Sequence, residues 1–129
     1  MLNRHDSREK LVFALYQHLL LKKDINECFN NNFIDEECDS LIADVKNDII
    51  DNKNNYIEEI SKHLVKWSFD RLNLIEQAIL LVAISEIKNG FNEKAVVIDE
   101  AIIITKTYCD DQSYKYINGV LDNICNRLA

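Results

Sequence analysis

The chain has 129 residues, of which 47% are hydrophobic, and a formal net charge of −7 because 22 acidic residues outnumber 15 basic ones. This length suits one domain, 1–129, with a core of its own. There is no proline and there are only two glycines, Gly90 and Gly119, so the tight turns that strand-rich folds require are scarce. The composition therefore favours an all-α fold of about seven helices.

Neither a membrane span nor an enzymatic centre is expected. No apolar run approaches the roughly 20 residues that cross a bilayer, and residues 1–6 do not open a signal peptide, so we expect a cytoplasmic protein. The four cysteines form no C-x-x-C pair and the three histidines lack ligand spacing, so no metal or cofactor is expected. No nucleophile or phosphate loop accompanies the carboxylates, and catalysis is not expected either.

Two helices are predicted at the start of the chain. Asn3 or Asp6 can cap the first helix, which runs to about Leu21 with apolar residues at helical spacing. A short second helix follows at about 24–31.

A polar break is predicted near the middle of the chain. A third helix is predicted over 35–50 and a fourth over 56–67, because both segments carry apolar residues three and four positions apart. The intervening segment, 51–55, is rich in asparagine, which favours turns and caps over helix interiors. This break predicts two packed helical subdomains, roughly 1–52 and 53–129.

The segment Leu74–Asn89 predicts the central helix of the fold. It is apolar nearly all round, which is typical of a helix buried on every side. Asn73 and Glu76 form a capping box at its start. Gly90 is well placed to end it in the left-handed conformation.

The last third of the chain predicts two more helices. The segment Ala95–Thr107 is rich in β-branched residues, which favour strands, but its apolar residues keep helical spacing. We interpret it as a helix. Asp111 or Ser113 can cap the final helix, and Gly119 lies in its interior, where glycine costs about 1 kcal/mol relative to alanine. Such a glycine makes sense where another backbone or a ligand approaches closely.

Three strings in the second half of the chain carry a family resemblance. They are W-S-F-D-R-L-N at 67–73, V-V-I-D-E-A at 96–101 and Y-I-N-G-V-L-D at 116–122. In this order and spacing they resemble the NusB family of bacterial transcription antitermination factors. The resemblance implies an all-helical, two-subdomain fold.

The resemblance also implies a function without covalent chemistry. The protein would be an RNA-binding adaptor that binds single-stranded boxA-type RNA in ribosomal RNA leaders. Its partner would be the small-subunit ribosomal protein S-ten (NusE), and it would act on the RNA polymerase complex indirectly.

Two other functions stay open from the sequence. One is a protein-interaction module with the same fold that has lost RNA binding, which the charge of −7 favours. In addition, Gln77 and Leu81 stand where the family often carries arginine. The other is the isolated N-terminal domain of an RNA cytosine methyltransferase, although no glycine-rich cofactor segment follows.

By the resemblance, five residues are expected to bind RNA. Basic residues near the start of the first helix match the family's arginine-rich box, and an exposed aromatic ring near the start of the last helix can stack on an unpaired base. These residues are Arg4, His5, Arg8, Lys115 and Tyr116.

Six further residues are expected to bind the partner or to support the fold. Tyr16 and Glu76 match family positions at the seam with ribosomal protein S-ten. Trp67 is expected to anchor the core with Arg71 as its polar neighbour, and Asn118 and Gly119 are expected to be structural.

Overall fold

The computed structural model describes residues 3–33, 40–66 and 68–128, and of 127 and 128 only the backbone. Within these ranges the chain forms six α-helices and one short 3-10 helix, with no strand. The predicted all-α fold is confirmed. None of the described helices is long and apolar enough to cross a membrane. The elements are α1 (Arg4–Leu21), α2 (Ile25–Asn32), α3 (Ser40–Ser61), η2 (Phe69–Arg71), α4 (Leu74–Asn89), α5 (Lys94–Tyr108) and α6 (Ser113–Leu128).

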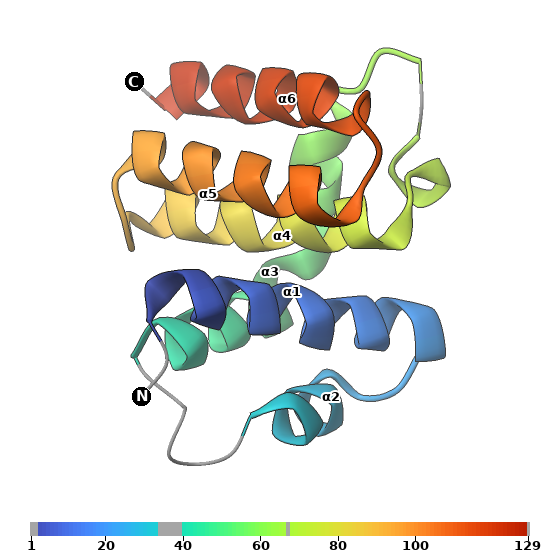
Figure 1. The fold of residues 1–129 in the computed structure, drawn as a ribbon, viewed down its shortest axis with the longest axis vertical. Coiled ribbons are helices and arrows are strands. Elements are labelled where there is room, and N and C mark those ends of the chain that lie inside the picture. Colours follow the sequence, from blue (N-terminus) through green and yellow to red (C-terminus); the bar gives the residue numbers. More distant parts are fainter. Residues whose placement is uncertain (1–2, 34–39, 67, 129) are drawn as a thin grey trace.

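Helix α4 is the centre of the molecule, as the sequence predicted. Every residue from Glu76 to Ile87 is buried, and the helix packs against α1, α3, α5 and α6. Figure 1 shows α4 between α1 and α5, with α6 beyond α5 and α3 passing behind. A helix surrounded in this way has to be apolar on all faces.

Both ends of α4 follow from local chemistry. The Asn73 side-chain oxygen accepts a hydrogen bond from the Ile75 amide at 2.9 Å, which satisfies one of the first unbonded N–H groups. Gly90 ends the helix with a φ of 65°, in the left-handed region that favours glycine. The Glu76 carboxylate, predicted to form a capping box with Asn73, interacts instead with Ser113 and Asp110, both of which influence its pKa.

The predicted break at 51–55 is wrong, because α3 runs through it without interruption. Asp48, Asn52 and Tyr56 are spaced by four residues and therefore share one face of the helix. The Asp48 carboxylate accepts hydrogen bonds from Asn52 at 3.0 Å, from the Tyr56 hydroxyl at 2.6 Å and, across the interface, from Ser85 of α4 at 2.7 Å. These polar residues form hydrogen bonds within α3 and between α3 and α4. The proposed subdomain boundary at 52/53 therefore falls inside a helix.

The ambiguous segment near residue 100 is the helix α5, as predicted. Its buried residues, Val97, Ala101, Ile104 and Thr105, fall on one face. The Thr105 hydroxyl donates to the Ala101 carbonyl at 2.7 Å, which lets a polar side chain lie in the core. The cap of α6 is neither Asp111 nor Ser113, because the Asp110 carboxylate accepts from the Gln112 and Ser113 amides at 3.1 and 3.2 Å.

Candidate nucleic-acid and protein interface

Arg8 lies inside the protein. Its side chain is only 5% exposed, and its guanidinium holds the Glu86 carboxylate through Nε to Oε2 and Nη2 to Oε1, both at 3.0 Å. Asn92 donates to the same carboxylate at 2.8 Å. The Arg8 guanidinium is therefore bound to Glu86 in the protein interior. This position contradicts its expected place on an RNA-binding surface. The sequence analysis did not predict Glu86 as the partner of Arg8, although an acid in the apolar interior of a helix implies a buried cation.

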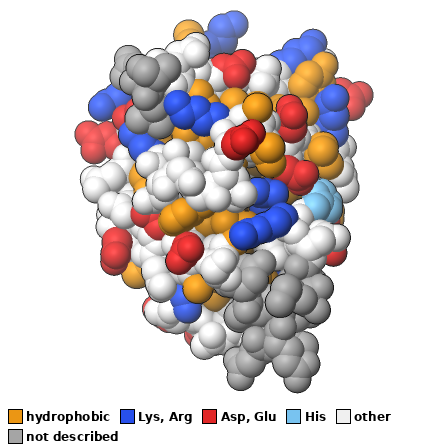
Figure 2. All heavy atoms as spheres, turned by 90° about the vertical axis from the view of Figure 1, so that its left-hand side faces the viewer, with side chains coloured by type: hydrophobic (Ala, Val, Ile, Leu, Met, Phe, Trp, Pro, Cys, Tyr) orange, Lys and Arg blue, Asp and Glu red, His pale blue; other side chains and the backbone are white. Residues whose placement is uncertain are grey.

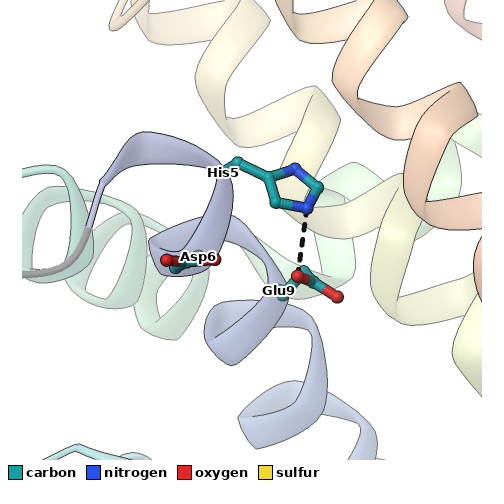
Figure 3. Close-up of side chains that lie close together, drawn as sticks. All are labelled: His5, Asp6 and Glu9. Carbon is teal, nitrogen blue, oxygen red and sulfur yellow. Dashed lines mark ion pairs between the residues drawn. The ribbon is translucent and has the colours of Figure 1, made fainter.

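His5 connects α1 to α5. Its Nε2 lies 3.0 Å from Glu9 and its Nδ1 lies 2.8 Å from Glu100, and the Tyr108 hydroxyl donates to Glu9. The hydrogen bond with Glu100 is the main cause that raises the pKa of His5 above its ordinary value. Figure 3 shows the ion pair between His5 and Glu9 on the first turns of α1.

The same turns could offer metal ligands. Ligand atoms of His5, Asp6 and Glu9 lie within 4.8 Å of one another. Both nitrogens of His5 already contact carboxylates, however, so the arrangement is a bridge between two helices, held together by charge-assisted hydrogen bonds.

This bridge predicts a pH dependence of stability. Because the pKa of His5 is higher in the folded state, protonation of His5 stabilises the fold below the ordinary value of 6.5, and this contribution is lost as pH rises through the higher, folded value. The melting temperature of the wild type should therefore fall relative to that of His5→Gln between about pH 5.5 and 8.5. Thermal unfolding of both proteins across this range measures the difference. A constant difference would contradict a charged bridge.

The five expected RNA-binding residues do not form one patch. In Figure 1 the first turn of α1, with Arg4 and His5, lies at the left, and the first turn of α6, with Lys115 and Tyr116, lies at the right. Arg4 and Lys115 are exposed. Figure 2 shows the left-hand face, where basic and acidic side chains are interspersed. The described side chains of this face form no continuous basic surface of the kind that attracts RNA from a distance.

Tyr116 separates two hollows in the surface. The first, which we name the Gly119 hollow, has a volume of about 320 Å³ and is lined by residues 63–66 and by Tyr116, Gly119, Val120 and Asn123. The second, which we name the Glu76 hollow, has a volume of about 310 Å³ and is lined by Arg71, Leu72, Asn73, Glu76, Asp110, Gln112, Ser113 and Tyr116. The connection after α3 passes beside the first half of α6, as the ribbon in Figure 1 shows.

The two hollows differ in charge. None of the described residues that line the Gly119 hollow is acidic, and one of them is Lys66. The Glu76 hollow contains two carboxylates, those of Glu76 and Asp110, against the one guanidinium of Arg71. Burial, followed by the nearby Asp110 carboxylate, raises the pKa of Glu76. A carboxylate in such surroundings is stabilised by an added positive charge.

The remaining expected residues are placed as follows. Tyr16 is half-buried against the core on α1, and the last turns of α1 lie at the same end of the molecule as the first turn of α4, which carries Glu76. Arg71 is exposed and lines the Glu76 hollow. Trp67 lies outside the described residues.

Asn118 and Gly119 do not have the expected packing roles. The Asn118 side chain is exposed and makes no hydrogen bond with another described residue. A Cβ atom added at Gly119 would meet nothing within 4 Å. No neighbouring backbone therefore requires the glycine, which contradicts that part of the prediction.

Comparison with known proteins gives a consistent result. A family model described as the NusB family matches residues 5–126. The "Transcription antitermination protein NusB" of Oceanobacillus iheyensis is 36% identical over 124 residues, which are 95% of this chain and 98% of the relative. The protein of the same name from Clostridium botulinum is 36% identical over 98% of this chain and 100% of its own length.

Solved structures have the same fold. The structure described as T. maritima NusB has a TM-score of 0.87 and 30% identity, covering 97% of this chain and 92% of that one. A structure of antitermination factors NusB and NusE in complex with dsRNA has a TM-score of 0.84 and covers 96% of both chains. Its identity of 22% supports the likeness of fold alone.

Proposed function

We propose that this chain, which belongs to the NusB family, is a non-enzymatic adaptor. It binds RNA and a basic protein side by side. The RNA is boxA-type sequence in ribosomal RNA leaders, and the protein is small-subunit ribosomal protein S-ten (NusE). The observation that carries the proposal is the position of Tyr116 between an acid-free hollow and an acidic one.

The RNA side of the proposal rests on the start of α6. Lys115 is exposed next to Tyr116, and Lys66 lines the acid-free Gly119 hollow. Lysines supply the phosphate contacts that dominate RNA affinity, and an aromatic ring stacks on bases without reading their sequence. Arg4 stays in the proposal as a separate contact at the other end of the molecule, because it is exposed.

The protein side of the proposal rests on the Glu76 hollow. Its two carboxylates favour a cationic side chain from the partner, since opposite charges across an interface stabilise a complex and exclude wrong partners. A relative of the same fold was crystallised with NusE and dsRNA, which supports a joint complex. Tyr16 is proposed at the edge of this interface.

The net charge explains why two ligands are proposed together. At −7 the chain repels a polyanion at long range, and the buried Arg8 removes one of the expected cations from the surface. A basic partner bound at the Glu76 hollow would supply positive charge beside Tyr116. RNA and partner would then each strengthen the binding of the other.

A fluorescence titration of labelled boxA-type RNA, with and without ribosomal protein S-ten, tests the RNA side. We expect weak binding alone and tighter binding with the partner. Tyr116→Ala should weaken binding about 5- to 150-fold, because one stacked base contributes about 1 to 3 kcal/mol, whereas Tyr116→Phe should keep it. With the phosphate contacts of Lys66 and Lys115 alone, the dissociation constant should rise about sevenfold between about 50 and 200 mM salt, and with Arg4 as a third contact about 18-fold.

Binding of ribosomal protein S-ten to two charge-reversal variants tests the partner side. Glu76→Lys should weaken the complex with ribosomal protein S-ten by charge reversal, while Glu58→Lys, which changes an exposed acid on α3, is the control for net charge. Circular dichroism reports whether the start of α4 is intact. If RNA does not bind even with the partner present, while the partner itself binds, the chain is a protein-interaction module, which the charge of −7 favours.

A further inference from the structure

Gly119 is not explained by the fold. It lies in the interior of α6, where glycine is the poorest helix former after proline. It does not adopt a positive φ, and a Cβ atom added there would lie in open space. Neither backbone conformation nor packing therefore requires a glycine at this position. Because Gly119 has no side chain, the space beside it stays open and forms part of the Gly119 hollow.

The walls of this hollow suit a planar, polar-edged ligand. One wall is Tyr116, whose ring offers a flat aromatic surface to a planar ligand. The Asn123 amide lines the opposite end of the α6 wall. Leu64 and Val120 add apolar surface, and a cavity of about 320 Å³ falls in the range that holds small-molecule ligands.

The charge of the hollow favours a nucleic acid. None of the acidic residues that the structure describes lines this hollow, and Lys66, which has an exposed side chain, is one of its lining residues. The adjacent Glu76 hollow has the opposite character. A basic protein segment would bind more favourably at the Glu76 hollow, because the carboxylates there attract its positive charge.

We propose that the Gly119 hollow holds one unpaired nucleobase of the bound RNA, and that Gly119 is glycine so that the base can lie against the α6 backbone. The base contacts the Tyr116 ring, and Lys66 lies beside the phosphate that follows it. This inference rests on the proposed RNA binding and adds to it a site for a single base.

Side chains added at Gly119 test the inference. Gly119→Ala should raise the melting temperature by about 3 to 5 °C, because alanine is the better helix former in a protein of this size, and should weaken RNA binding. Gly119→Leu fills more of the hollow and should weaken RNA binding about 5- to 150-fold, the loss of one base contact. Asn118→Leu places the same side chain on the neighbouring exposed position of α6, outside the hollow, and should bind RNA like the wild type.

An abasic scan of the RNA tests the same point without changing the protein. Removing the base at one position of the boxA-type RNA should weaken binding to the wild type, and Gly119→Leu should be insensitive to that removal. If Gly119→Leu binds RNA like the wild type, or weakens only the complex with ribosomal protein S-ten, the base site is overturned while RNA binding stands. If the wild type binds no RNA with the partner present, the proposed function falls first.

Discussion

Replacing Arg8 by alanine is expected to lower the free energy of unfolding by about 3 to 5 kcal/mol. The substitution removes one partner of a buried ion pair and leaves the Glu86 carboxylate, whose side chain is 1% exposed, without its cation. Asn92 keeps a single hydrogen bond to that carboxylate, which does not neutralise its charge. Chemical denaturation monitored by circular dichroism measures the loss.

A double replacement is the control for this prediction. Arg8→Met together with Glu86→Leu removes both charges and keeps apolar volume, so it should recover most of the lost stability. An unchanged denaturation midpoint for Arg8→Ala would contradict the buried pair. Any loss of RNA binding by Arg8→Ala has to be judged against this instability, because Arg8 is not on the surface.

Replacing Ile79 by aspartate is expected to abolish cooperative folding. Ile79 is 1% exposed in the middle of α4, the helix that packs against α1, α3, α5 and α6. An ionised carboxylate buried there without a partner costs many kcal/mol, whereas the whole stability of a domain is about 5 to 15 kcal/mol. Thermal unfolding followed by circular dichroism should show no sigmoidal transition.

Ile79→Val is the matched control, since it removes one methylene group without adding charge. It should cost only about 0.5 to 1.5 kcal/mol and keep a cooperative transition. A folded Ile79→Asp protein with the melting temperature of the wild type would contradict the central position of α4.

Local chemistry made part of the fold predictable. The Asn73 cap, the Gly90 terminator and the apolar residues between them act within a few residues of one another, so the bounds of α4 could be derived before any tertiary contact was known. The helical spacing in α5 likewise outweighed its β-branched composition. Tyr116 and Glu76 could be identified only through the family resemblance, since an aromatic ring or an acid at a helix start has ordinary structural explanations.

The sequence by itself determined the helical class, the central helix and the family. Only the tertiary structure decided what the polar residues do. Arg8 meets Glu86 across 78 positions of the chain, and His5 meets Glu100 across 95. In the asparagine-rich helix α3, the Asp48 carboxylate accepts hydrogen bonds from Asn52, Tyr56 and Ser85, and these bonds stabilise the helix and its contact with α4. Helix periodicity shows which face of a helix is buried but not which buried charge or hydroxyl will face it from another helix, because that pairing depends on how the helices pack together.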